Sequence, residues 1–81
     1  MQDRTQKIIK ELKLKKKAFK KALKRIQSSH ILYTTFKMRT TIDILLGNDK
    51  VAVKHTYTEE QIIQELHIVK TMIEFFKSDL S

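Results

Sequence analysis

The stretch 58-TEEQIIQELHIVKTMIEFFKSDL-80 carries the strongest structural signal in the sequence. Thr58 and Gln61 have the spacing of a capping box, and glutamates follow the threonine where the positive end of a helix dipole favours them. The apolar residues then recur at intervals of three and four, as on one face of an α-helix; they are Ile62, Leu66, Val69, Ile73, Phe76 and Leu80. We therefore predict a helix over residues 59–79.

This helix is apolar over more than one stripe. Ile63 adds to one flank of the stripe, and Ile68, Met72 and Phe75 add to the other flank. The apolar arc covers about 240°, against about 100° for an ordinary surface helix. Because 81 residues offer little material to cover such an arc, we expect a homodimer whose interface includes Ile68, Met72 and Phe75.

Two strands are predicted immediately before this helix. Residues 34–46 alternate between apolar and polar side chains and are rich in β-branched residues, as expected of a strand. Residues 47–50, Gly-Asn-Asp-Lys, are typical of a turn, and residues 51–57 form the second strand. The first strand would be long, so there are two alternatives: the strand starts later, or a short helix occupies the residues around 30–35.

A two-residue turn at Asn48–Asp49 sets the register of the predicted hairpin. It places apolar pairs on one face, and an opposite-charge pair and a threonine pair on the other, as cross-strand energetics favour. The pairs are Leu46 with Val51, Ile44 with Val53, Ile42 with His55, Asp43 with Lys54, and Thr41 with Thr56. A slip by one residue would destroy both matches.

The first part of the chain predicts a second amphipathic helix, over residues 3–27. Its apolar residues fall within one arc at about 100° per residue; they are Ile8, Leu12, Phe19, Leu23 and Ile26, with Ile9 and Ala22 beside them. The expected fold is a single α+β domain over residues 1–81. Its order is α-β-β-α, with both helices packed on the β-hairpin.

The positive charge of the chain is concentrated in this first helix. The net charge is +8, and residues 1–27 hold eleven Lys and Arg against two Asp and Glu. Six lysines project within about 100° of arc, opposite the apolar stripe, and extend along about 20 Å of helix; they are Lys10, Lys13, Lys17, Lys20, Lys21 and Lys24. Leu14 lies exposed among them, and Lys15 and Lys16, at the border of the apolar stripe, are expected to extend their ammonium groups towards solvent.

A row of lysines of this length can meet several phosphates of a nucleic acid. The sequence therefore predicts a nucleic-acid-binding regulator, with DNA as the expected partner and with further contacts from Arg25, Lys37 and Arg39. Lysines hold a phosphate backbone without reading bases, so binding is expected to be largely independent of sequence. No known nucleic-acid-binding motif is present in the sequence.

Other interpretations of the basic helix remain open. The chain can instead be an interaction module or inhibitor that binds an acidic surface of another protein, with Ile68, Met72 and Phe75 as its main contacts. A basic amphipathic helix can also lie on anionic lipid, but here its apolar stripe is needed for the core. The lysines can also be no more than a well-solvated surface that keeps the protein in solution.

Catalysis, metals and cofactors are not expected. The chain has no cysteine, and its three histidines, His30, His55 and His67, lack metal-ligand spacing. No phosphate-binding loop or strained nucleophile turn is present. The sequence has neither a membrane-spanning apolar run nor the apolar core of a signal peptide near its beginning, so we expect a cytoplasmic protein.

Overall fold

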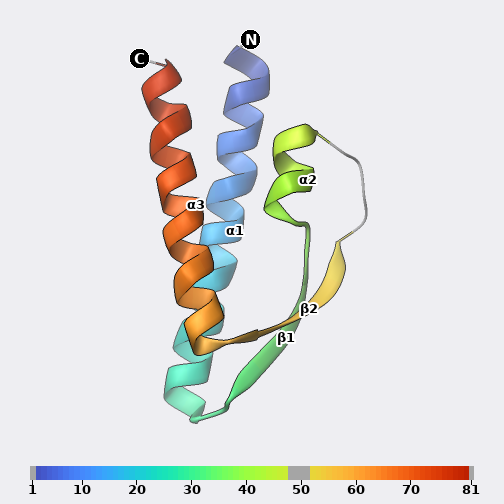
Figure 1. Cartoon of the computed structure of the whole chain (residues 1–81), viewed down its shortest axis with the longest axis vertical. Helices are drawn as coiled ribbons and strands as arrows, with labels where there is room; N and C mark the ends of the chain where they lie inside the picture. Colours follow the sequence, from blue (N-terminus) through green and yellow to red (C-terminus); the bar gives the residue numbers. More distant parts are fainter. Residues whose placement is uncertain (1, 48–51, 81) are drawn as a thin grey trace.

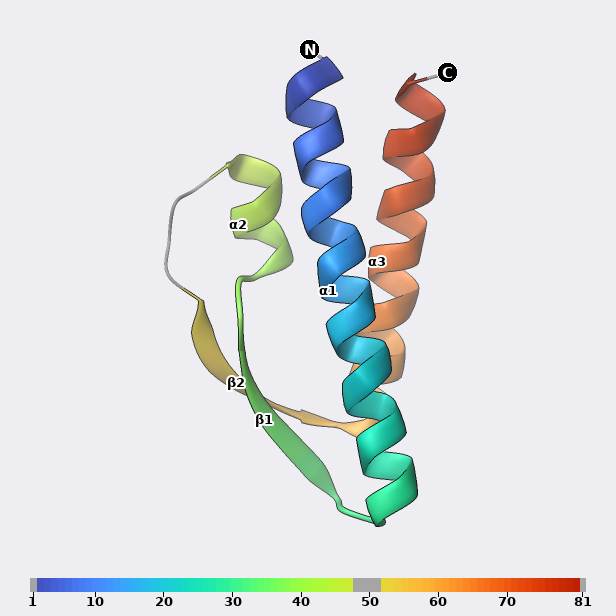
Figure 2. The same ribbon diagram turned by 180° about the vertical axis from the view of Figure 1, so that it is seen from behind.

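The computed structural model describes residues 2–47 and 52–80. Figure 1 shows two long helices side by side and antiparallel, with a two-stranded antiparallel hairpin and a short helix on one side of them. Figure 2 shows the same arrangement from behind. The elements are α1 (Gln2–Ser29), β1 (Tyr33–Met38), α2 (Thr41–Leu46), β2 (Val53–Thr58) and α3 (Glu59–Leu80). The predicted combination of two long helices with a hairpin is confirmed, and α2 was not predicted.

The predicted capping box at the start of α3 is confirmed. The Thr58 backbone N–H donates to Gln61 Oε1 over 2.9 Å, and the Gln61 N–H donates to Thr58 Oγ1 over 3.3 Å. Since β2 ends at Thr58 and α3 begins at the next residue, the hairpin joins α3 without a linker. α1 extends to Ser29 and is followed by His30 in the left-handed region, with φ 54°.

The predicted first strand is wrong beyond Met38, because residues 41–46 form α2. Thr40 caps this helix: its Oγ1 accepts the Asp43 N–H over 3.1 Å and donates to Asp43 Oδ2 over 2.8 Å. Gly47 ends it with φ 71°, a conformation that costs glycine little. Ile44 is 5% exposed whereas Ile42 is 67% exposed, although a strand would have placed both on one face.

The predicted register is therefore also wrong. Lys54 lies opposite Lys37 rather than Asp43, and Thr56 pairs with Thr35 rather than Thr41, with their hydroxyl oxygens 2.9 Å apart. His55 and Val53 face Phe36 and Met38. Thr56 thus pairs with a threonine, as predicted, although with a different one. The expected pair of opposite charges is replaced by two lysines. The predicted turn at 48–49 and the predicted partner Val51 lie outside the described residues.

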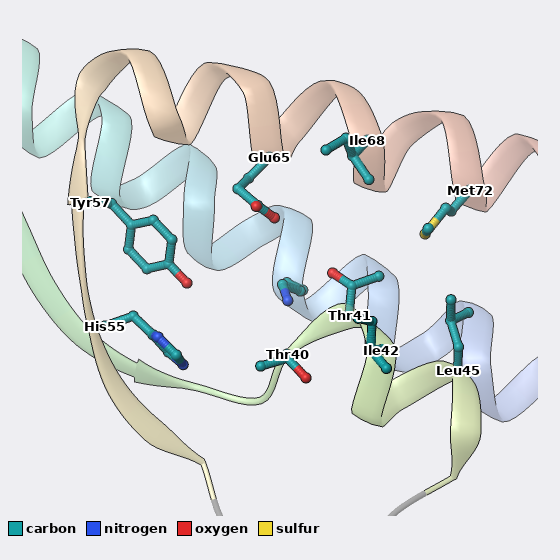
Figure 3. A pocket seen from close by; sticks show the side chains of 10 residues that line it. Thr40, Thr41, Ile42, Leu45, His55, Tyr57, Glu65, Ile68 and Met72 are labelled. Atoms are coloured by element: carbon teal, nitrogen blue, oxygen red, sulfur yellow. The ribbon is translucent and has the colours of Figure 1, made fainter.

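A groove separates α3 from α2 and β2. Its cavity volume is about 480 Å³, and Figure 3 shows side chains from all three elements that line it. The groove lies where α2 packs mainly on α1, while β2 continues directly into α3 at Thr58. The space between these two attachments is left open to solvent.

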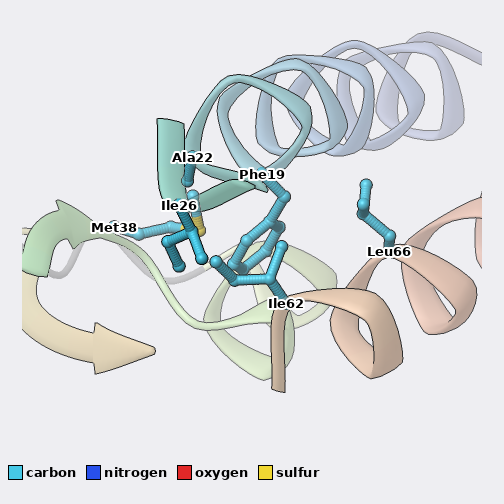
Figure 4. Close-up of a cluster of buried hydrophobic side chains, with 6 residues drawn as sticks. All are labelled: Phe19, Ala22, Ile26, Met38, Ile62 and Leu66. Atoms are coloured by element: carbon cyan, nitrogen blue, oxygen red, sulfur yellow. The ribbon is translucent and has the colours of Figure 1, made fainter. Parts of the chain in front are cut away.

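The hydrophobic core lies between α1 and α3 and has two parts. The part beside the hairpin, drawn in Figure 4, consists of Phe19, Ala22, Ile26, Met38, Ile62 and Leu66. The part beside α2 consists of Ile8, Leu12, Ile44, Val69 and Ile73. Phe19 is fully buried and packs edge-on against Phe36 and Tyr57, at ring-centroid distances of 5.8 and 5.1 Å. The predicted apolar stripes of both helices thus meet in the core.

Candidate functional site

The basic residues predicted on α1 form one exposed surface. We call it the basic face; it consists of Lys10, Lys13, Lys17, Lys20, Lys21, Lys24 and Arg25, all of which are exposed. They share the side of α1 turned away from the apolar stripe, because residues three, four and seven apart lie on one side of a helix. Leu14, as predicted, is exposed among them.

The basic face is not neutralised by carboxylates of the described residues. None of these lysines forms a salt bridge within 4.0 Å there. Glu11, the acid on the same helix, is bound by Arg39, and Glu59 accepts a hydrogen bond from Gln27 Nε2 over 3.2 Å. The ammonium groups therefore repel one another across solvent, and a polyanion would relieve that repulsion.

Arg39 does not belong to the basic face. It follows β1, and its Nη1 forms a salt bridge with Glu11 Oε2 at 3.1 Å, in a partly buried position. Its Nη2 also donates to the Asp43 backbone oxygen over 3.4 Å. The guanidinium thereby connects α1 to α2 and is already engaged within the fold.

Lys37 lies on the solvent face of the hairpin, as expected, and it lies directly opposite Lys54. Both side chains are exposed. Sequence reasoning missed Lys54 because the predicted register gave it Asp43 as a partner. The two lysines add a second cluster of positive charge to the surface. Like charges that face each other across two strands destabilise the sheet.

Lys15 is buried, contrary to the expectation that its ammonium would reach solvent. The side chain is 6% exposed, and its Nζ donates to the Arg39 backbone oxygen over 2.9 Å and lies 5.8 Å from the centre of the Phe19 ring. Burial lowers the pKa of this ammonium, and the negative charges of Glu65 and Asp43 offset part of the effect. Burial, followed by the charge of Glu65, raises the pKa of the Tyr57 phenol on the same groove.

The lowered pKa of Lys15 gives a testable pH dependence. Between the folded-state pKa and the unfolded-state value of about 10.4, the unfolded chain binds more protons, so stability rises with pH. The raised pKa of Tyr57 acts in the opposite direction above about pH 10, since there the folded chain holds its proton longer. We expect the unfolding free energy of the wild type, minus that of Lys15→Met, to increase with pH up to about 10.4.

Urea unfolding of both proteins at a series of pH values measures this difference. Lys17→Met, which removes an exposed ammonium from the same helix, controls for the change in net charge. If the unfolding free energies of the wild type and Lys15→Met change with pH in parallel, the pKa of Lys15 is not lowered in the folded state.

The flank of α3 predicted as a dimer interface divides into two parts. Ile68 and Met72 line the groove, and Met72 also packs against the core beside α2. Phe75 is 69% exposed and packs edge-on against Phe76, with ring centroids 5.5 Å apart. Phe75 is therefore the largest exposed apolar residue of this flank.

The described residues contain no group of three His, Cys, Asp or Glu side chains arranged to hold a metal ion. None of the helices in this part of the chain is both long enough and apolar enough to cross a membrane. Comparisons with protein-family models, curated proteins and solved structures found no match to this chain.

Proposed function

We propose that the protein is a small cytoplasmic nucleic-acid-binding protein that holds phosphates with the basic face of α1. The observation that carries the proposal is an exposed row of six lysines with no carboxylate of the described residues within 4.0 Å. A row about 20 Å long can meet several phosphates, and each contact releases condensed counterions. DNA is the expected partner, Arg25 continues the row, and Lys37 with Lys54 supplies a second contact.

Salt dependence is the measurement that tests this proposal. A labelled duplex and a labelled single strand are titrated at several salt concentrations near and above 50 mM. If the face meets four or five phosphates, the logarithm of the affinity falls with the logarithm of salt with a slope of about −4 for duplex DNA. Lys17→Gln combined with Lys20→Gln should weaken binding and flatten the slope by about 2, because two phosphate contacts are lost.

A control with the same change in net charge separates local contacts from overall attraction. Gln64→Glu combined with Thr71→Glu also lowers the charge by two, at exposed positions of α3. We expect this variant to keep most of the wild-type slope. Absence of binding to both nucleic acids near 50 mM salt contradicts the proposal, and binding to an acidic protein instead would favour the interaction-module alternative.

We also propose that the chain forms a homodimer through the part of this α3 flank that lies outside the groove, with Phe75 as its main apolar contact. The exposure of this ring supports the proposal, since large aromatic side chains are typical of interface centres. Sedimentation equilibrium of the protein used in the titrations gives its mass. A folded monomer at the concentrations of those titrations contradicts self-association.

A further inference from the structure

The groove between α3, α2 and β2 has a polar end and an apolar end. In Figure 3, Tyr57, His55 and Glu65 lie at one end, and Ile68, Met72 and Leu45 lie at the other. A cavity of about 480 Å³ is within the size range of small-molecule sites, which combine apolar walls with a few polar groups. The amphipathic character of the groove indicates a ligand that is itself polar at one end.

Hydrogen-bonding capacity is left over at the polar end. Lys15 lines the groove, and its buried ammonium makes one hydrogen bond within the described residues, to the Arg39 oxygen. A primary ammonium has three N–H donors, so two of them need acceptors from elsewhere. Glu65 lines the same end and acts on Lys15 through its charge, but it makes no salt bridge with Lys15 within 4.0 Å.

Glu65 supplies an acceptor to the same groove that Lys15 lines. A donor from Lys15 and an acceptor from Glu65 are therefore both available to a molecule bound in this cavity.

We propose that this groove binds a small uncharged molecule that carries a carboxamide at the end of an apolar chain. The carboxamide oxygen accepts from Lys15, its NH₂ group donates to Glu65, and the chain packs on Ile68 and Met72. Lys15 and Glu65 carry one charge each and of opposite sign. A carboxylate head would therefore be repelled by Glu65, and an ammonium head by Lys15. This inference does not depend on nucleic-acid binding, because the basic face lies on the opposite side of α1 from Lys15.

The test compares three probes that share one alkyl chain: hexanamide, hexanoate and hexylammonium. Methyl-labelled protein is titrated at neutral pH, and the methyl signals of Ile68 and Met72 are followed by NMR. We expect hexanamide to shift both signals with a dissociation constant of about 1–10 mM, as is usual for so small a ligand. Hexanoate and hexylammonium should bind at least about fivefold more weakly than hexanamide, which corresponds to a difference of about 1 kcal/mol in binding free energy.

Two variants test the assigned polar contacts. Glu65→Gln removes the negative charge from the groove, so it should raise the affinity for hexanoate and lower that for hexylammonium. Lys15→Met should weaken hexanamide and hexanoate severalfold and should not weaken hexylammonium, because Lys15 repels that probe. Glu60→Gln, the same change at an exposed position of α3 outside the groove, should change none of the three affinities. Equal binding of all three probes, or no shift of the two methyl signals with hexanamide, overturns the proposal.

Discussion

Phe19→Ala is expected to lower the unfolding free energy by about 3–5 kcal/mol. The ring is fully buried in the core beside the hairpin, and it contacts both Phe36 and Tyr57 edge-on. Such aromatic contacts add about 0.5–1.5 kcal/mol each to the effect of burial. A small domain has a total stability of about 5–15 kcal/mol, so this single change removes a large fraction of it.

Urea denaturation followed by near-ultraviolet circular dichroism measures the effect of Phe19→Ala. The chain has no tryptophan and two tyrosines, and Tyr57 contacts the ring that is removed. Phe19→Leu should cost less and keep a folded protein for comparison. Leu14→Ala, at an exposed position of the same helix, should cost less than about 0.5 kcal/mol. A similar small loss for Phe19→Ala would contradict the assigned core.

Ile44→Ala is expected to cost about 2–5 kcal/mol, whereas Ile42→Ala should change stability by less than about 0.5 kcal/mol. Ile44 is 5% exposed and packs in the core beside α2, while Ile42 is 67% exposed. The two substitutions are chemically identical and lie two residues apart. They therefore separate the helix over 41–46 from the strand that the alternating pattern predicted.

Thermal or urea unfolding of the two isoleucine variants provides the comparison. A strand would place Ile42 and Ile44 on one face, so both substitutions would have similar costs. Equal losses of stability would therefore support a strand over residues 41–46. A large loss for Ile44→Ala alone would support the helix.

The sequence was sufficient to predict α1 and α3 because several independent signals agreed. In α3, the capping box at Thr58 and Gln61 precedes an apolar stripe that continues for the length of the helix. Long periodic segments leave few competing structures, so their type and approximate ends are predictable. The hairpin was predictable as a pair of strands, but its register was not, because register depends on where the first strand ends.

The error at α2 arose from two competing patterns in the same residues. Residues 40–43, Thr-Thr-Ile-Asp, have the spacing of a capping box, and Gly47 follows at a distance suited to a helix end. The same residues also continue a polar–apolar alternation from the preceding strand. In a helix of six residues, periodicity carries little information, so the capping residues were the better guide.

The basic face could be predicted because it depends only on the geometry of one helix. Lys15 could have been placed with the core, since it follows Ile8 by seven residues and precedes Ala22 by seven. It was instead predicted to reach solvent because its side chain is charged. The pairing of Arg39 with Glu11 could not be deduced, because it joins residues 28 positions apart through the packing of α2 on α1.

The two lysines that face each other across the hairpin also affect how copies of the protein meet. Each strand of the two-stranded sheet has one edge that no described strand pairs with, and exposed strand edges promote aggregation between molecules. If a second copy added its β1 with the two Lys37 residues opposite each other, or its β2 with the two Lys54 residues opposite each other, the row of like charges would lengthen. In these registers the repulsion that weakens the hairpin internally would also disfavour growth into a larger sheet.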